Sequence, residues 1–170
     1  DEAVKYYLGS VLSAVGNYRG LKATAVGGYK SADVLDGIFY EFDKESHLIP
    51  GRVGEYFFHD QKSVYDRLGD PYFSYSGPTS MGKSFVVQTY IKEQIEKGST
   101  GNYAILVPTK ALINEVRSNM FDGLQDELTA RNYRVVSAIG EIYLQQDHHF
   151  IFIMTPERMH HLLIERPDMN

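Results

Sequence analysis

The chain has 170 residues, a net charge of −5, 43% hydrophobic residues and no cysteine. These values fit one folded domain, or a domain with an appendage, and exclude general disorder, disulfides and thiolate metal sites. No apolar run is long enough to cross a membrane and the first residues lack a signal-peptide pattern, so a cytoplasmic protein is expected. The negative charge disfavours a protein that coats nucleic acid, but it allows a local groove.

The first part of the chain has the spacing of helices. Apolar residues recur with helical period over residues 1–17. Ser31 or Asp33 is then placed to cap a second helix over residues 34–42. We expect residues 1–48 to form a small helical segment that covers the edge of the following domain. A binding role for this segment remains open.

A second domain is expected over residues 49–170, because the Pro50-Gly51 pair breaks both helical and strand periodicity. The pattern over 62–68 predicts a helix that ends at Gly69. The short aromatic run over 71–75 predicts a strand.

The next stretch, SGPTSMGKS, matches the phosphate-binding pattern G-x-x-x-x-G-K-[ST] at every fixed position. Gly77 and Gly82 allow backbone amides to approach a polyphosphate, and helical spacing over 85–95 supplies a helix N-terminus behind them. Lys83 offers a positive charge to the phosphates and Ser84 a hydroxyl to Mg²⁺, so these two are the predicted catalytic groups. The predicted phosphate-binding residues are Gly77, Pro78, Thr79, Ser80, Met81, Gly82, Lys83 and Ser84. The plain alternative is a glycine-rich turn that binds nothing.

Strands and helices alternate in the rest of the chain. Strands are predicted over 102–107, 133–139 and 150–154, and the last is nearly all apolar, which favours a central position. Between the first two, Thr109 is placed to cap a long helix that reaches Leu128. This order predicts an α/β domain with a mainly parallel sheet.

Three stretches follow these strands, where open parallel sheets bind ligands: VPTKAL (107–112), AIGE (138–141) and MTPERM (154–159). Together with the GPTSMGKS loop they resemble the first RecA-like domain of superfamily 2 helicases, the DEAD/DEAH-box group, over about residues 55–164. The resemblance implies a P-loop NTPase (RecA-like) fold with flanking helices, incomplete here, with ATP and Mg²⁺ as cofactors and Mg²⁺ held through ATP by Ser84.

The resemblance also implies that these turns hold the sugar-phosphate backbone of a DNA or RNA strand without regard to its sequence. The residue types in these turns are consistent with backbone binding, because hydroxyl groups and cations at helix N-termini bind phosphate. N-capping by the threonines is compatible with this role. Without the resemblance, a salt bridge of Arg158 with Glu157 or with a surface carboxylate is an equal alternative. The predicted nucleic-acid residues are Thr109, Lys110, Gly140, Thr155 and Arg158.

Gln61 resembles the glutamine that recognises adenine upstream of the phosphate loop in many of these helicases. A carboxamide donates and accepts at once, which suits the adenine edge. Phe58 is placed to stack on the base. The alternatives are that Gln61 caps the following helix and that Phe58 belongs to the core.

One departure from the family pattern limits the expected activity. In that family, motif II (D-E-x-[DH]) should follow the TPER stretch (155–158). The sequence up to Asn170 does not contain this motif. Asp126-Glu127 does not qualify, because it lies within the predicted long helix. We therefore expect an N-terminal fragment of a helicase that needs the second RecA-like domain of the same protein and hydrolyses almost nothing alone.

Two other functions stay open. One is a nucleotide-dependent switch or assembly module that does not translocate, and the other is an interaction domain whose phosphate loop no longer binds. The pairs His148-His149 and His160-His161 are interpreted as surface residues rather than a metal site, because neighbouring side chains on a strand or helix point apart.

Overall fold

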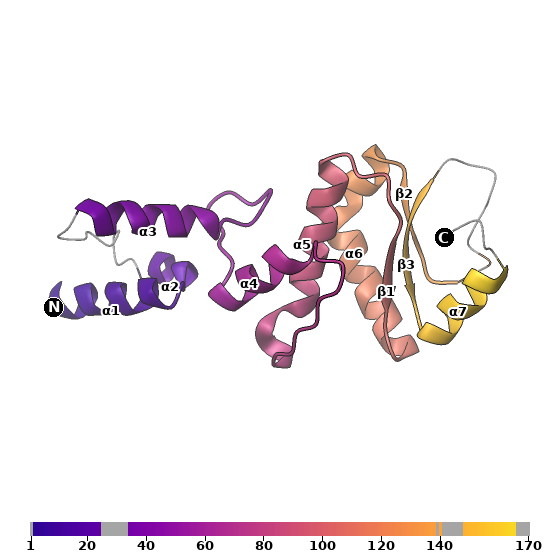
Figure 1. The fold of residues 1–170 in the computed structure, drawn as a ribbon, viewed down its shortest axis with the longest axis horizontal. Coiled ribbons are helices and arrows are strands. Elements are labelled where there is room, and N and C mark those ends of the chain that lie inside the picture. The colour runs from indigo at the N-terminus through magenta and orange to yellow at the C-terminus, as the bar shows by residue number, and fades with distance from the viewer. Residues whose placement is uncertain (1, 25–33, 139, 141–147, 166–170) are drawn as a thin grey trace. The chain divides into compact units, whose positions relative to one another are not determined.

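A computed structural model describes residues 2–24, 34–138, 140 and 148–165 of the protein (Figure 1). The chain divides into two compact units, Asp1–Thr89 and Tyr90–Asn170. Helix α5 (Lys83–Glu96) begins in the first unit and ends in the second.

Three helices open the first unit. Helix α1 (Glu2–Ala14) is followed by Gly16, whose φ of +63° is a backbone conformation that ends a helix. Helix α2 (Tyr18–Ala23) was not predicted, and it begins where the Asn17 side chain accepts a hydrogen bond from the Gly20 amide. Helix α3 (Val34–Ser46) confirms the second predicted helix, while its predicted caps lie outside the described residues.

The helical segment has a thin core. Tyr18, Leu21 and Tyr40 are buried together. Most apolar side chains on the long helices face outward, as Val11 and Phe39 do with 59% and 69% of their surfaces exposed. Packing among these helices therefore stabilises the segment weakly.

The segment continues into a second cluster of buried side chains. Leu48 forms an isolated antiparallel bridge with Tyr56. Ile49 and Phe57, which are 2% and 1% exposed, pack with Val64 of helix α4 (His59–Arg67) and with Val86 of α5. Helix α4 begins three residues earlier than the pattern over 62–68 predicted. The predicted domain boundary after residue 48 stays a prediction.

The strand predicted over 71–75 is wrong, because the structure assigns no strand to these residues. Phe73 and Tyr75 stack on each other at 5.5 Å between ring centroids and pack against the buried cluster. The Arg67 guanidinium lies 4.6 Å from the Phe73 ring centroid. The alternation of aromatic residues thus reflects side-chain packing onto a helical core, and within the described residues no ladder forms here.

The second unit contains a three-stranded sheet in the order β1-β3-β2. Strands β1 (Tyr103–Leu106) and β2 (Tyr133–Val136) each pair in parallel with β3 (His149–Met154). The prediction of a parallel α/β sheet with the apolar 150–154 strand at its centre is confirmed.

Helices cover both faces of this sheet (Figure 1). Helix α6 (Lys110–Ala130) lies on one face and helix α7 (Pro156–Glu165) on the other. Alternate residues of β3 pack with Met159 and Leu162 of α7. Because the central strand is covered twice, Ile151 and Ile153 are fully buried, and each contributes roughly 1.5–3 kcal/mol through burial.

Candidate functional site

The glycine-rich loop that precedes α5 has a shape that depends on its second glycine. After extended Pro78, a single 3-10 turn (Thr79–Met81) leads to Gly82 in the left-handed conformation, with φ of +76°. A Cβ atom on Gly82 would lie 2.9 Å from the Gln61 amide nitrogen. Both the backbone angle and the close approach require glycine at this position. The three atoms nearest to a Cβ on Gly77 would all belong to the flexible Met81 side chain.

Lys83 turns its side chain back into the loop. Its Nζ donates hydrogen bonds to the carbonyls of Gly77 and Pro78, at 2.7 and 2.9 Å. The ammonium is therefore positioned inside the loop by two acceptors that phosphate oxygens could replace. The residues present fit a polyphosphate, because a cation, an adaptable loop and a helix N-terminus occur together.

Ser84 is exposed on the first turn of α5. Its side chain is accessible to solvent, so the hydroxyl could bind a metal ion that phosphate oxygens also bind. In the described chain no three His, Asp or Glu side chains gather to hold a metal ion by themselves.

Gln61 is buried, with 6% of its surface exposed, and it connects α4 to the loop. Its Oε1 accepts from the Phe58 amide at 3.1 Å, which closes the first turn of α4. Its Nε2 donates to the Met81 carbonyl at 2.9 Å. The helix-capping interpretation is therefore realised, and adenine recognition by Gln61 stays a prediction.

Phe58 is not a core residue, since 40% of its surface is exposed while neighbouring Phe57 is 1% exposed. The Arg19 guanidinium lies 5.4 Å from the Phe58 ring centroid. Arg19 is itself held by a 2.8 Å hydrogen bond to the Tyr56 carbonyl. Phe58 thus offers an aromatic surface supported by a cation, and its role in base stacking remains a prediction.

In the second unit, the turns predicted to contact nucleic acid follow the carboxyl ends of parallel strands. Leu106 at the end of β1 pairs with Met154 at the end of β3, so Thr109 and Thr155 lie at the same sheet edge. The Val107 amide donates to the Met154 carbonyl at 3.0 Å, which extends this pairing by one residue. The structure brings these two turns together as the sequence order suggested.

Both threonines are engaged at helix N-termini. Thr109 Oγ1 accepts from the Leu112 amide at 3.4 Å, which confirms the predicted cap of α6, and Lys110 is exposed beside it. At α7, the Glu157 carboxylate accepts hydrogen bonds from its own amide and from the Thr155 side chain, and these lower the pKa of Glu157. A side-chain anion therefore already occupies part of the position where a phosphate would bind.

Arg158 reaches the end of strand β2. Its Nη1 donates to the Ser137 carbonyl at 3.1 Å, immediately after β2. Arg117 of α6 donates to the Ser137 hydroxyl at 2.8 Å. Two arginines thus meet at the buried Ser137, three residues before exposed Gly140.

Arg117 was missed by sequence reasoning. It lies in the middle of the amphipathic helix α6, where a cation has the appearance of a solvated surface residue. Its hydrogen bond to Ser137, the residue directly after β2, places Arg117 at the sheet edge, and this contact depends on tertiary structure.

Glu127 lies within α6, as predicted, and forms an ion pair with Lys92. Burial acts to raise the pKa of Glu127, but the hydrogen bond from Lys92 and its own backbone amide outweigh burial and lower it. The Lys92 Nζ lies 2.9 Å from the Glu127 carboxylate.

Every helix that the structure describes is too short or too polar to traverse a lipid bilayer. No curated protein and no solved structure gives a significant match to the chain. The family model of the DEAD/DEAH box helicase matches residues 59–170, which include the glycine-rich loop and the turns at the sheet edge. Because this match covers well over half of the sequence and agrees with the parallel α/β sheet, the chain belongs to the DEAD/DEAH box helicase family.

Proposed function

We propose that this chain is the ATP-binding part of a superfamily 2 helicase or translocase, which couples ATP hydrolysis to movement on nucleic acid or to its unwinding. The observation that carries the proposal is the position of the Lys83 ammonium, inside a loop whose left-handed Gly82 leads directly into α5. In the whole protein a second RecA-like domain would act with this one.

Three groups of the chain bind the nucleotide in this proposal. Lys83 exchanges the carbonyls of Gly77 and Pro78 for phosphate oxygens, which are stronger acceptors for an ammonium. Ser84 contributes a hydroxyl ligand to Mg²⁺, and Gln61 orients the adenine edge. ATP with Mg²⁺ supplies the phosphoryl group and the free energy that drives movement.

These groups bind and orient, but they supply neither a base nor a water-positioning residue. Phosphoryl transfer also needs a carboxylate at the metal and cations that stabilise the transition state. We therefore expect slow hydrolysis, at most, by the 170 residues alone.

A nucleic-acid strand would contact the sheet edge of the second unit in this proposal. Thr109, Lys110 and Gly140 would offer a hydroxyl, a cation and an exposed backbone, and Thr155 and Arg158 would do the same at α7. Such groups contact phosphates rather than base edges, so binding should be indifferent to sequence and should weaken with salt.

Isothermal titration with MgATP tests the nucleotide site. Replacing Lys83 by alanine should weaken binding about 30-fold, because a charge-assisted contact is lost. The matched control is Lys97→Ala, since Lys97 is exposed and pairs only with nearby Glu93 among the ion pairs of the described residues. Equal affinity of the Lys83→Ala variant and the unaltered chain would contradict the proposal.

A further inference from the structure

A pocket of about 610 Å³ adjoins the glycine-rich loop within the first unit. Three segments line it: the turn between α1 and α2, the first turn of α4, and the loop itself. Its volume is in the range of small-molecule sites. Because Pro78, Ser80 and Met81 belong to both the loop and the pocket, the pocket begins where the proposed phosphate site ends.

The α1–α2 turn, defined here as residues 14–17, packs directly on α4. Gly16 approaches His59 so closely that a Cβ atom on Gly16 would lie 3.1 Å from the His59 Cβ. On the other side of the same helical turn, Gln61 donates to the Met81 carbonyl. The first turn of α4 is therefore in contact with both the helical segment and the loop.

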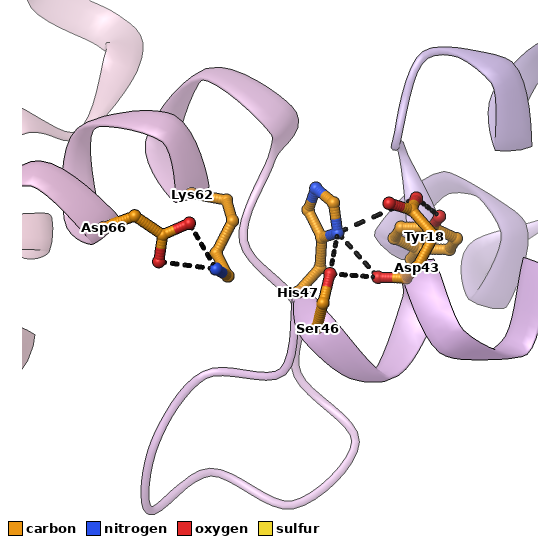
Figure 2. Close-up of polar contacts among 6 residues, drawn as sticks. All are labelled: Tyr18, Asp43, Ser46, His47, Lys62 and Asp66. Atoms are coloured by element: carbon orange, nitrogen blue, oxygen red, sulfur yellow. Dashed lines mark hydrogen bonds and ion pairs between the residues drawn. The ribbon is translucent and has the colours of Figure 1, made fainter. Parts of the chain in front are cut away.

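Polar contacts join Tyr18, the first residue after the α1–α2 turn, to the end of α3 (Figure 2). Tyr18, directly after the turn, donates a hydrogen bond to Asp43. His47 is 3% exposed, and its Nδ1 lies 2.8 Å from the Asp43 carbonyl and 3.2 Å from Ser46 Oγ. Its ring lies 5.3 Å from the ring of Tyr18 and 5.9 Å from that of His59. These contacts connect Tyr18, which directly follows the turn, to His47 and through its ring to His59 of α4.

Two apolar surfaces in the pocket are open to solvent. Val15 is 57% exposed and Phe58 is 40% exposed, and both line the pocket. Asn17 and Gln61 line it as well, and their amide groups also form hydrogen bonds with Gly20, Phe58 and Met81. Apolar surfaces beside a few amides suit a planar heteroaromatic base, which is apolar on its faces and polar at its edge.

We propose that the α1–α2 turn forms one wall of the pocket that receives the base of the bound nucleotide, with Val15 contacting the base. This inference rests on the proposed function, since it requires the phosphates to lie on the glycine-rich loop. The helical segment is then part of the nucleotide site, and nucleotide binding restrains it.

Titration of the full chain with MgATP and with inorganic tripolyphosphate tests this wall. Replacing Val15 by serine should weaken MgATP binding about fivefold, because apolar contact with the base is lost, and should leave tripolyphosphate binding unchanged. Val15→Ile should retain the affinity of the unaltered chain for MgATP. Val11→Ser is the matched control, because Val11 is 59% exposed on the same helix and is not among the lining residues.

The outcomes separate this inference from the proposed function. If Val15→Ser binds MgATP as tightly as Val11→Ser while Lys83→Ala binds it more weakly, the proposed contact of Val15 with the base is wrong. The proposed phosphate site at the loop is then supported. Equal weakening for MgATP and tripolyphosphate also overturns the base contact. Failure of the unaltered chain to bind MgATP overturns both proposals. Thermal unfolding of the two valine variants should coincide, which shows that folding does not cause the difference.

Discussion

The glycine-rich loop before α5 and the threonine turns before α6 and α7 are the proposed phosphate sites of the protein, and they differ although each precedes a helix N-terminus. The loop uses a left-handed Gly82 with φ of +76°, a conformation that other residues rarely adopt. Thr109 instead has an ordinary extended backbone, with φ of −136° and ψ of 153°. The loop therefore depends on a glycine backbone, whereas the turn at Thr109 uses a conformation that any residue adopts.

The groups that fill these sites also differ. In the loop a cation, Lys83, is held by carbonyls, so an incoming anion gains a new partner. At α7 an anion, Glu157, already accepts from Thr155 and from the backbone, so an incoming phosphate must displace it. The comparison predicts tight binding of a polyphosphate at the loop and weak, salt-sensitive binding of a nucleic-acid backbone at the turns.

The largest expected effect separates a glycine that the fold requires from one that it does not. Replacing Gly82 by alanine should reduce the free energy of unfolding by about 2 kcal/mol, through backbone strain and through displacement of the Gln61 amide. The control is Gly140→Ala, where a Cβ would meet nothing within 4 Å, and it should change stability by less than about 0.5 kcal/mol. Urea denaturation measures the free energy of unfolding of both variants. Equal losses of stability would contradict the claim that the fold requires glycine at position 82 but not at position 140.

A smaller effect is expected at the cap of α6. Replacing Thr109 by alanine removes the acceptor for the Leu112 amide and should lower the free energy of unfolding by about 1 kcal/mol. Thr109→Ser should restore most of this loss. Thr100→Ala, at an exposed position of the loop before β1, is the comparison variant. If Thr109→Ala matches Thr100→Ala in denaturation, the cap does not stabilise the helix.

The smallest expected effect concerns Glu157. Replacing it by glutamine removes the anion at α7 and should tighten binding of a single-stranded oligonucleotide about two- to threefold at low salt. Fluorescence anisotropy measures this affinity, and Glu165→Gln, at the other end of α7, is the control. Weaker binding by the Glu157→Gln variant would show that the carboxylate does not compete with phosphate.

The lowered pKa of Glu157 adds a pH dependence to this test. A carboxyl group whose pKa is lower in the folded state stabilises the fold at pH values above its unfolded pKa. That contribution is lost as the pH falls through the folded value. The stability difference between the unaltered chain and Glu157→Gln should therefore be present at neutral pH and should disappear in strong acid.

Sequence patterns predicted the parts of the fold that depend on repeated burial. Strand β3 is apolar at nearly every position because helices cover it on both faces, so its central place was visible in the sequence. Helix α2 was missed because it is only six residues long and contains Gly20, although Asn17 provided a capping signal. The false strand over 71–75 arose because aromatic residues that pack on helices can alternate like those of a strand.

The candidate site was predictable where local residue types determine the chemistry. The pattern around Lys83 specifies a loop and a helix start without tertiary information. The bond between Gln61 and Met81, which lie 20 residues apart, and the meeting of Arg158 with Ser137 depend on tertiary packing. No spacing rule in a single sequence could have predicted these contacts.

The most direct test is an NMR titration of the labelled chain with tripolyphosphate, observing the amides of residues 77–84. If the loop is the phosphate site, the amide signals of Gly82, Lys83 and Ser84 should shift most. At the ligand concentration that half-saturates the unaltered chain, Lys83→Ala should lose nearly all of the shifts at Gly82 and Ser84. Binding that leaves these amides unchanged, or shifts that persist at full size in Lys83→Ala, would contradict the assignment of the loop as the nucleotide site.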